Sequence, residues 1–172
     1  VSIRILEARR CRGRAMDYGL GELRDAVRAD EHVLRRHIAV HEPKLVPVVG
    51  ADVFVAWRHL FPGGVRDIAI ARSSDGGRTF QPPTRVSEDN WKIDACPDDG
   101  PAMTVDADGV LRLAWPPLVT DAGGPRQAIF ETSSRDNGGT FSPRTRVDGA
   151  GGVAAHPRIA NDRAGRTAIV WD

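Results

Sequence analysis

The sequence has almost no net charge, few cysteines and no long apolar run. Its 24 Lys and Arg residues against 23 Asp and Glu residues leave a formal net charge of +1, which gives no electrostatic reason to expect a nucleic acid or an anionic membrane as partner. No apolar run approaches the roughly 20 residues that span a bilayer. Cys11 and Cys96 make no zinc signature, and they leave open either a disulfide or two free thiols. We expect no metal and no cofactor.

Glycine and proline are abundant instead, with 18 and 12 copies among 172 residues. This composition suits short strands that are joined by tight turns. A repeat organises those strands, because proline and tryptophan recur together with steps of 58 and then 56 residues, at Pro43, Pro101, Pro157, Trp57, Trp115 and Trp171. Each of the three segments predicts a strand, a turn rich in Asn, Asp and Gly, and a second strand that ends at the tryptophan.

A second pattern follows the first two of these segments. An apolar stretch leads into Ser-x-Asp-x-Gly-x-Thr-Phe at residues 73–80, and the same motif returns 61 residues later at 134–141. Proline and an Arg-Val pair then follow in both copies. The unit is thus four predicted antiparallel strands in about 58 residues, the size of a propeller blade. Hairpin turns are expected near Asp52, Asp75, Asp108, Asp136 and Asp162.

This motif, found twice at blade spacing, resembles the Asp box of sialidases and related propellers. The resemblance implies an all-β fold, a partial sialidase-type β-propeller of about two and a third four-stranded blades within 41–172, at 41–88, 99–148 and, incomplete, 155–172. In such a box the polar side chains hold backbone amides of a tight turn, glycine takes positive φ, and the aromatic ring packs between strands. The residues concerned are Ser73, Asp75, Gly77, Phe80, Ser134, Asp136, Gly138 and Phe141. The three tryptophans are expected to serve packing.

The first 40 residues do not fit the repeat and form a separate N-terminal segment, 1–40. Apolar residues there fall near helical spacing, which predicts an amphipathic helix from about Gly21 to Arg36. The basic run from Arg9 to Arg14 is interpreted as a solvated segment. The helix would either cap an open edge of the repeat or be an unrelated leader.

Long polar loops follow the second and fourth strands of each unit and share one end of the sheets. Loops on a rigid scaffold often carry binding residues. Arginine pairs with a carboxylate through two hydrogen bonds, and tryptophan stacks on a sugar face. These loops therefore suggest a site for a carboxylated sugar, although solvated loops with local salt bridges would carry the same residues. The candidates for substrate binding are Arg58, His59, Arg66, Trp91, Asp98 and Asp99.

The catalytic residues that the resemblance implies are only partly present. Sialidases carry an arginine two positions before the proline of an early inner strand, and His41, Asp99 and Ala155 occupy those positions here. Asp67 is the nearest substitute for the acid/base aspartate. The sequence has one tyrosine, Tyr18, which lies outside the repeat and does not match the nucleophile.

Two functions stay open at this level. One is a glycan-directed hydrolase of the exo-sialidase type, of which this chain would be an incomplete part that acts on or binds acidic sugars. The alternative is a non-catalytic propeller that serves as a binding or assembly module, and a truncated gene product is a third reading. Flanking coding sequence with a tyrosine, a glutamate and two arginines would favour the enzyme. The resemblance alone favours an extracytoplasmic or secreted protein, and exposed blade faces predict self-association or further blades.

Overall fold

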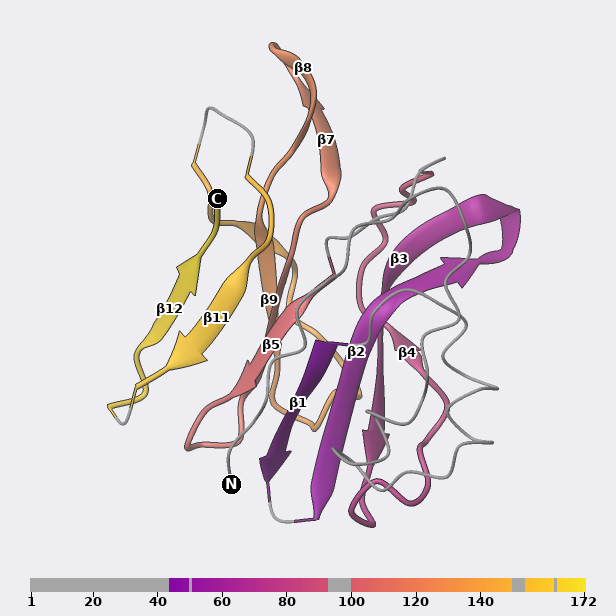
Figure 1. The fold of residues 1–172 in the computed structure, drawn as a ribbon, viewed down its shortest axis with the longest axis vertical. Coiled ribbons are helices and arrows are strands. Elements are labelled where there is room, and N and C mark those ends of the chain that lie inside the picture. The colour runs from indigo at the N-terminus through magenta and orange to yellow at the C-terminus, as the bar shows by residue number, and fades with distance from the viewer. Residues whose placement is uncertain (1–43, 50, 93–99, 150–153, 163) are drawn as a thin grey trace.

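A computed structural model describes residues 44–49, 51–92, 100–149, 154–162 and 164–172. Two four-stranded antiparallel sheets form the body, and two hairpins accompany them (Figure 1). The first sheet has the order β1-β2-β3-β4 and contains β1 (Lys44–Val49), β2 (Asp52–Phe61), β3 (Val65–Ser73) and β4 (Thr84–Arg85). A 3-10 turn, Pro62–Gly64, joins β2 to β3. The predicted all-β class is confirmed, and none of the described sheets closes on itself.

The second sheet has the same arrangement of strands, with the order β10-β9-β6-β5 from its fourth strand to its first. Its strands are β5 (Ala102–Val105), β6 (Leu111–Trp115), β9 (Phe130–Ser134) and β10 (Thr145–Arg146). Just after the fourth strand of each sheet, equivalent backbone hydrogen bonds extend the pairing. Val86 N donates to Ile68 O at 2.8 Å in the first sheet, and Val147 N donates to Ile129 O at 2.9 Å in the second. The 61-residue repeat of the sequence is therefore also a repeat of hydrogen bonding.

A hairpin of β11 (Arg158–Asn161) and β12 (Thr167–Val170) lies beside the second sheet. The first strands of the three units are neighbours, since β5 contacts β1 on one side and β11 on the other (Figure 1). Asn161 Nδ2 donates to Thr104 Oγ1 at 3.1 Å and links β11 to β5.

The core lies between these sheets, because the central strands are apolar on both faces. Phe54, Ala56, Ile68 and Ile70 of the first sheet pack against Leu111, Leu113 and Trp115 of the second. The far face of the second sheet, with Ala114 and Ile129, receives Ile159 and Ile169 of the β11–β12 hairpin. Burial on both faces explains why β2 and β3 are nearly continuous apolar runs rather than alternating ones.

The hairpin turns form near the aspartates where the sequence predicts them. Asp106 Oδ1 accepts from the amides of Asp108 and Val110, at 3.0 and 2.9 Å, and closes the β5–β6 turn. Asp162 Oδ1 does the same for Ala164 and Arg166, at 2.9 Å each. Such side-chain bonds replace the backbone partners that a tight turn lacks. The turn expected near Asp52 lies just before it, because Asp52 is the first residue of β2.

One segment that the sequence predicts to be a loop is a β-hairpin in the structure. Residues 116–126 were expected to be a loop, but β7 (Leu118–Asp121) pairs with β8 (Gly124–Gln127) and projects from the body (Figure 1). Asp121 Oδ1 accepts from Gly123 N at 3.0 Å, and Gly124 takes a φ of 95°. The turn signal Asp-Ala-Gly-Gly was thus present in the sequence, but the short strands beside it lack a strong apolar pattern.

The three tryptophans differ in their surroundings. Trp57 and Trp115 are fully buried, whereas Trp171 keeps 40% of its surface exposed. Within the described residues β12 pairs with β11 alone, so no strand covers its other edge. The packing role predicted for all three therefore holds for the first two.

The expected helix at 21–36, both cysteines, Tyr18, His41, Asp98 and Asp99 lie outside the described residues. In the part of the chain that the structure describes, no helix is long and apolar enough to cross a bilayer.

Candidate functional site

The two Ser-x-Asp motifs form the same hydrogen-bonded turn at one end of the sheets. Asp75 Oδ1 accepts from the amides of Arg78 and Thr79, at 2.9 Å each, and from Ser73 Oγ at 2.7 Å, while Oδ2 accepts from Thr79 Oγ1 at 2.7 Å. Bonds from the Thr79 amide and hydroxyl, with further bonds from Ser73 and Arg78, hold the pKa of Asp75 far below its ordinary value. Ser73 Oγ in turn accepts from Gly77 N at 2.8 Å.

The second turn copies the first. Asp136 accepts from Thr140 N at 2.9 Å, from Thr140 Oγ1 at 2.6 Å and from Ser134 Oγ at 2.7 Å. Gly138, with a φ of 85°, donates to Ser134 Oγ at 2.8 Å. Bonds from the Thr140 hydroxyl and amide, and then from Ser134, hold the pKa of Asp136 far below its ordinary value. Both carboxylates thus hold the backbone of their turns.

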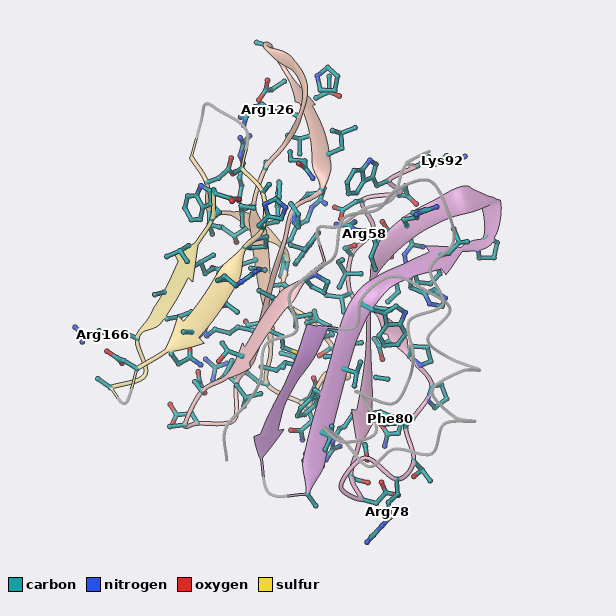
Figure 2. The ribbon with its side chains drawn as sticks, viewed as in Figure 1. Arg58, Arg78, Phe80, Lys92, Arg126 and Arg166 are labelled. Carbon is teal, nitrogen blue, oxygen red and sulfur yellow. The ribbon has the colours of Figure 1, made fainter. Side chains whose placement is uncertain are left out.

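The aromatic residue that ends each motif is only partly buried. Phe80 packs against the cluster of Val55, Trp57, Ala69 and Ala71 on the first sheet, and Phe141 packs against the core between the two sheets. Each ring therefore anchors its turn to a sheet while leaving part of its surface to solvent. Figure 2 shows Phe80 near this end of the molecule, with Arg78 reaching outward beyond it.

The described residues among those proposed for sugar binding lie at the opposite end, and Arg58 and His59 lie on different faces of the first sheet. Arg58 and His59 are consecutive in β2, and successive strand residues point to opposite faces. Arg58 lies on the face that packs against the second sheet. His59 lies on the other face, directly across from Asp67 of β3 in the strand register. Arg58 and His59 therefore do not belong to one cluster on a single face of the sheet.

Arg58 is buried between the sheets, with 2% of its surface exposed. Its Nη1 donates to Arg66 O and its Nη2 donates to Pro116 O, both at 3.2 Å. The guanidinium also lies over the ring of Trp91, with Cζ 4.5 Å from the ring centroid. Arg58 and Trp91 thus contact each other, but both are buried, and Arg58 bonds to the segment that follows β6 of the second sheet. Figure 2 shows where Arg58 lies.

The segment that carries Trp91 is held against β3. Arg66 N donates to Trp91 O at 2.8 Å, and Lys92 forms a bridge with Val65. Lys92 is exposed at this end of the molecule (Figure 2). The backbone of Arg66 therefore takes part in positioning Trp91.

Asp67, the acid/base candidate, is fully buried and ion-paired with Arg85. Arg85 Nε donates to Asp67 Oδ2 at 3.0 Å, and Arg85 Nη2 contacts the same oxygen. The guanidinium is fixed further by Ser87 O and Asn90 Oδ1, each at 3.0 Å. A substrate reaches Asp67 only if Arg85 moves away.

The second sheet holds an equivalent arginine with its carboxylate in a different place. Arg146 donates from Nε and Nη2 to Asp148, at 2.8 and 3.0 Å. Burial alone would raise the pKa of Asp148, but the hydrogen bond and charge of Arg146 outweigh it and lower that pKa. By the 61-residue spacing, Asp148 corresponds to Ser87 and Ala128 corresponds to Asp67. Because both sheets pair this arginine with a carboxylate, the pair has a structural role.

His59 is held by aromatic neighbours on the same face as Asp67. Trp57 Nε1 donates to His59 Nδ1 at 3.1 Å, and the imidazole meets the Phe61 ring edge-on at a centroid distance of 4.5 Å. Burial lowers the pKa of His59 from its ordinary value. The ring is therefore neutral near pH 7, with its hydrogen on Nε2 because Nδ1 accepts from the indole.

Asp89 connects the two sheets, a role that the sequence does not predict. Its Oδ2 accepts from Trp115 Nε1 at 2.7 Å, and its Oδ1 is ion-paired with Arg144. Asp89 follows the first sheet, whereas Trp115 ends β6 and Arg144 directly precedes β10 of the second, so this buried carboxylate links the two units. Its place three residues after the Arg-Val pair is visible in the sequence, but its pairing with Trp115, 26 residues away, is not.

Among the described residues, no group of three or more His, Cys, Asp or Glu side chains is placed to hold a metal ion.

No protein-family model and no curated protein matches the chain. Several solved structures, including the following two, are similar to part of it. One is a protein of unknown function from Dyadobacter fermentans DSM 18053, 15% identical with a TM-score of 0.46, and the match covers 73% of this chain and 44% of that one. The other is the Hadza microbial sialidase Hz136, 19% identical with a TM-score of 0.36, and the match covers 63% of this chain and 23% of that one. The chain thus spans less than half the length of either protein.

Proposed function

We propose that this chain is part of a sialidase-like Asp-box β-propeller. The two four-stranded sheets would be successive blades, with bounds near 41–88 and 99–148, and the β11–β12 hairpin within 155–172 would be the inner half of the next. The arrangement of the first strands supports this, because β1, β5 and β11 are neighbours, as the inner strands of propeller blades are. The matching turns at Asp75 and Asp136 support it further.

We also propose that the chain binds acidic sugars and does not hydrolyse them. The observation that carries the second part of this proposal, the lack of hydrolysis, is the burial of Asp67 beneath Arg85. A glycosidase acid must reach the glycosidic oxygen, and a carboxylate that is covered by an arginine does not. Polar loops at the same end of the sheets still offer exposed donors, among them those of Lys92 and Asn90.

Binding and turnover test this proposal separately. Saturation-transfer NMR of the purified chain with N-acetylneuraminic acid should show binding, and glucose, a neutral sugar, should show much less. Added salt should weaken the interaction, because an exposed ionic contact is screened. Equal signals from the two sugars would contradict an acidic-sugar site.

Turnover is followed with a fluorogenic sialoside. We expect no release of fluorophore above the buffer control. Release that is abolished by Asp67→Asn and unaffected by Arg78→Met would contradict a purely binding role and establish a hydrolase of the exo-sialidase type.

A further inference from the structure

Arg85 is a rigidly held arginine that still faces solvent. Its side chain is 33% exposed, although its partner Asp67 is fully buried. Within the described residues, every hydrogen bond of the guanidinium uses Nε or Nη2, and none uses Nη1. Two N–H bonds of Nη1 are therefore available on a group whose orientation is already fixed. Such preorganisation lowers the entropy lost when a ligand binds.

A second donor lies on the same face. His59 is partly exposed, and its Nδ1 accepts from Trp57, so Nε2 carries the hydrogen that a ligand would accept. The Phe61 ring contacts both residues, with its centroid 4.5 Å from that of His59 and 4.8 Å from Arg85 Cζ. Two polar groups thus contact one partly exposed aromatic ring, and such a combination is common in small-ligand sites.

This combination belongs to the first sheet alone. The second sheet keeps the arginine as Arg146, but the residues one repeat after His59 and Phe61 are Pro117 and Val119. Neither residue offers a side-chain donor or an aromatic ring. The fold therefore explains the arginine, which recurs, but does not explain the histidine and phenylalanine beside it.

We propose that Arg85 Nη1 and His59 Nε2 form a subsite for a carboxylate group, with the Phe61 ring beside the apolar part of the ligand. Arginine suits this role, because its planar N–H groups match carboxylate oxygens. The subsite rests on the proposed binding of acidic sugars and names the residues that would take the acidic group. In this proposal Arg85 takes the carboxylate-binding role first expected of Arg58, because the Arg58 guanidinium is buried and bonds to Arg66 O and Pro116 O.

The test uses a variant that removes the arginine without leaving a buried charge. In Asp67→Ala/Arg85→Met both members of the ion pair are lost, so the net charge is unchanged, and Ala128 shows that alanine is tolerated at the matching place. The control is Arg78→Met, which removes an exposed arginine at the opposite end of the molecule (Figure 2). Acetate, N-acetylneuraminic acid and glucose are titrated into each protein and followed by NMR, including the Nε–H signals of the arginines.

In the wild-type protein, acetate and N-acetylneuraminic acid should both shift the Nε–H signal that is missing from the double variant. The double variant should bind N-acetylneuraminic acid roughly tenfold more weakly, which is the loss of one charge-assisted hydrogen bond. Arg78→Met should bind as the wild type does. Far-ultraviolet circular dichroism confirms that each variant is folded.

Three results separate the two proposals. If N-acetylneuraminic acid binds the double variant as tightly as the wild type, the Arg85 subsite is wrong and acidic-sugar binding stands. If acetate shifts the Arg85 signal but acidic sugars bind no better than glucose, the subsite stands and the proposed function is wrong. If no carboxylate shifts the Arg85 signal, the subsite is overturned.

Discussion

Arg85→Ala should destabilise the protein much more than Asp67→Ala, although the two residues form one ion pair. Without Arg85, a carboxylate that is 0% exposed loses its partner, and an uncompensated buried charge costs about 3–5 kcal/mol of unfolding free energy. Without Asp67, the guanidinium is still 33% exposed and water can solvate it. Asp67→Ala also removes Oδ1, a buried oxygen that accepts no hydrogen bond among the described residues. We therefore expect a cost of about 1 kcal/mol for Asp67→Ala.

The second sheet supplies a rescue for this pair. There the carboxylate lies two residues after the arginine, at Asp148, and alanine occupies the place of Asp67. Asp67→Ala/Ser87→Asp transfers this arrangement to the first sheet. Ser87 Oγ accepts from Ile68 N at 2.9 Å, and an aspartate at this position can accept the same amide. The double variant should recover most of the stability lost in Asp67→Ala, to within about 0.5 kcal/mol of the wild type.

Urea unfolding followed by circular dichroism measures these differences, at low protein concentration so that association does not contribute. Three single variants are needed with the double variant, namely Asp67→Ala, Ser87→Asp and Arg85→Ala, because they complete the thermodynamic comparison. Equal destabilisation by Arg85→Ala and Asp67→Ala would refute the reasoning from burial. A double variant less stable than both of its parents would refute the equivalence of the two sheets.

Three further predictions concern single positions. Phe80→Ala should cost about 2 kcal/mol in urea unfolding, below the value for a fully buried ring, because Phe80 is only partly buried, and no measurable cost would contradict its packing role. Folding lowers the pKa of His59, so as the pH falls the unfolded chain takes up the proton at a higher pH than the folded chain. The free energy of unfolding should therefore decrease from about pH 7 to pH 5. His59→Gln should flatten this slope, and an unchanged slope would assign it to other groups. Folding also lowers the pKa of Asp136, so its contribution to the free energy of unfolding is present above its unfolded pKa of about 3.9 and is lost as the pH falls below that value. Asp136→Asn should therefore lose less stability on acidification than the wild type, as thermal melts at each pH would show.

Much of the fold follows from the repeat. Proline, tryptophan and the Ser-x-Asp turns recur at fixed spacing, and each predicts backbone structure from local physics, because turn residues and apolar runs act over a few positions. The strands and most turns were therefore predictable. The β7–β8 hairpin was not, since Leu118 and Val119 alone give too short an apolar pattern to distinguish a strand from a loop.

The candidate site was less predictable, because its geometry depends on which face each side chain occupies. Sequence proximity groups Arg58 with His59, but the period of two in a strand sends them to opposite faces. Burial is equally hidden, since only the docking of the second sheet covers Arg58. The pairing of Asp67 with Arg85 joins residues 18 positions apart, and the strand register that sets it is fixed by the whole sheet.

The repeat also separates residues that serve the fold from residues that serve something else. Positions that match in both sheets hold turns and ion pairs, as Asp75 and Asp136 do, and as Arg85 and Arg146 do. A position that differs is not required by the architecture, because the other sheet forms without it. The differences between the sheets include His59 and Phe61, which lie on one face at one end of the first sheet, where Phe61 contacts both His59 and the guanidinium of Arg85. Functional sites are built on a fold by such local departures, so this face is where a ligand is expected.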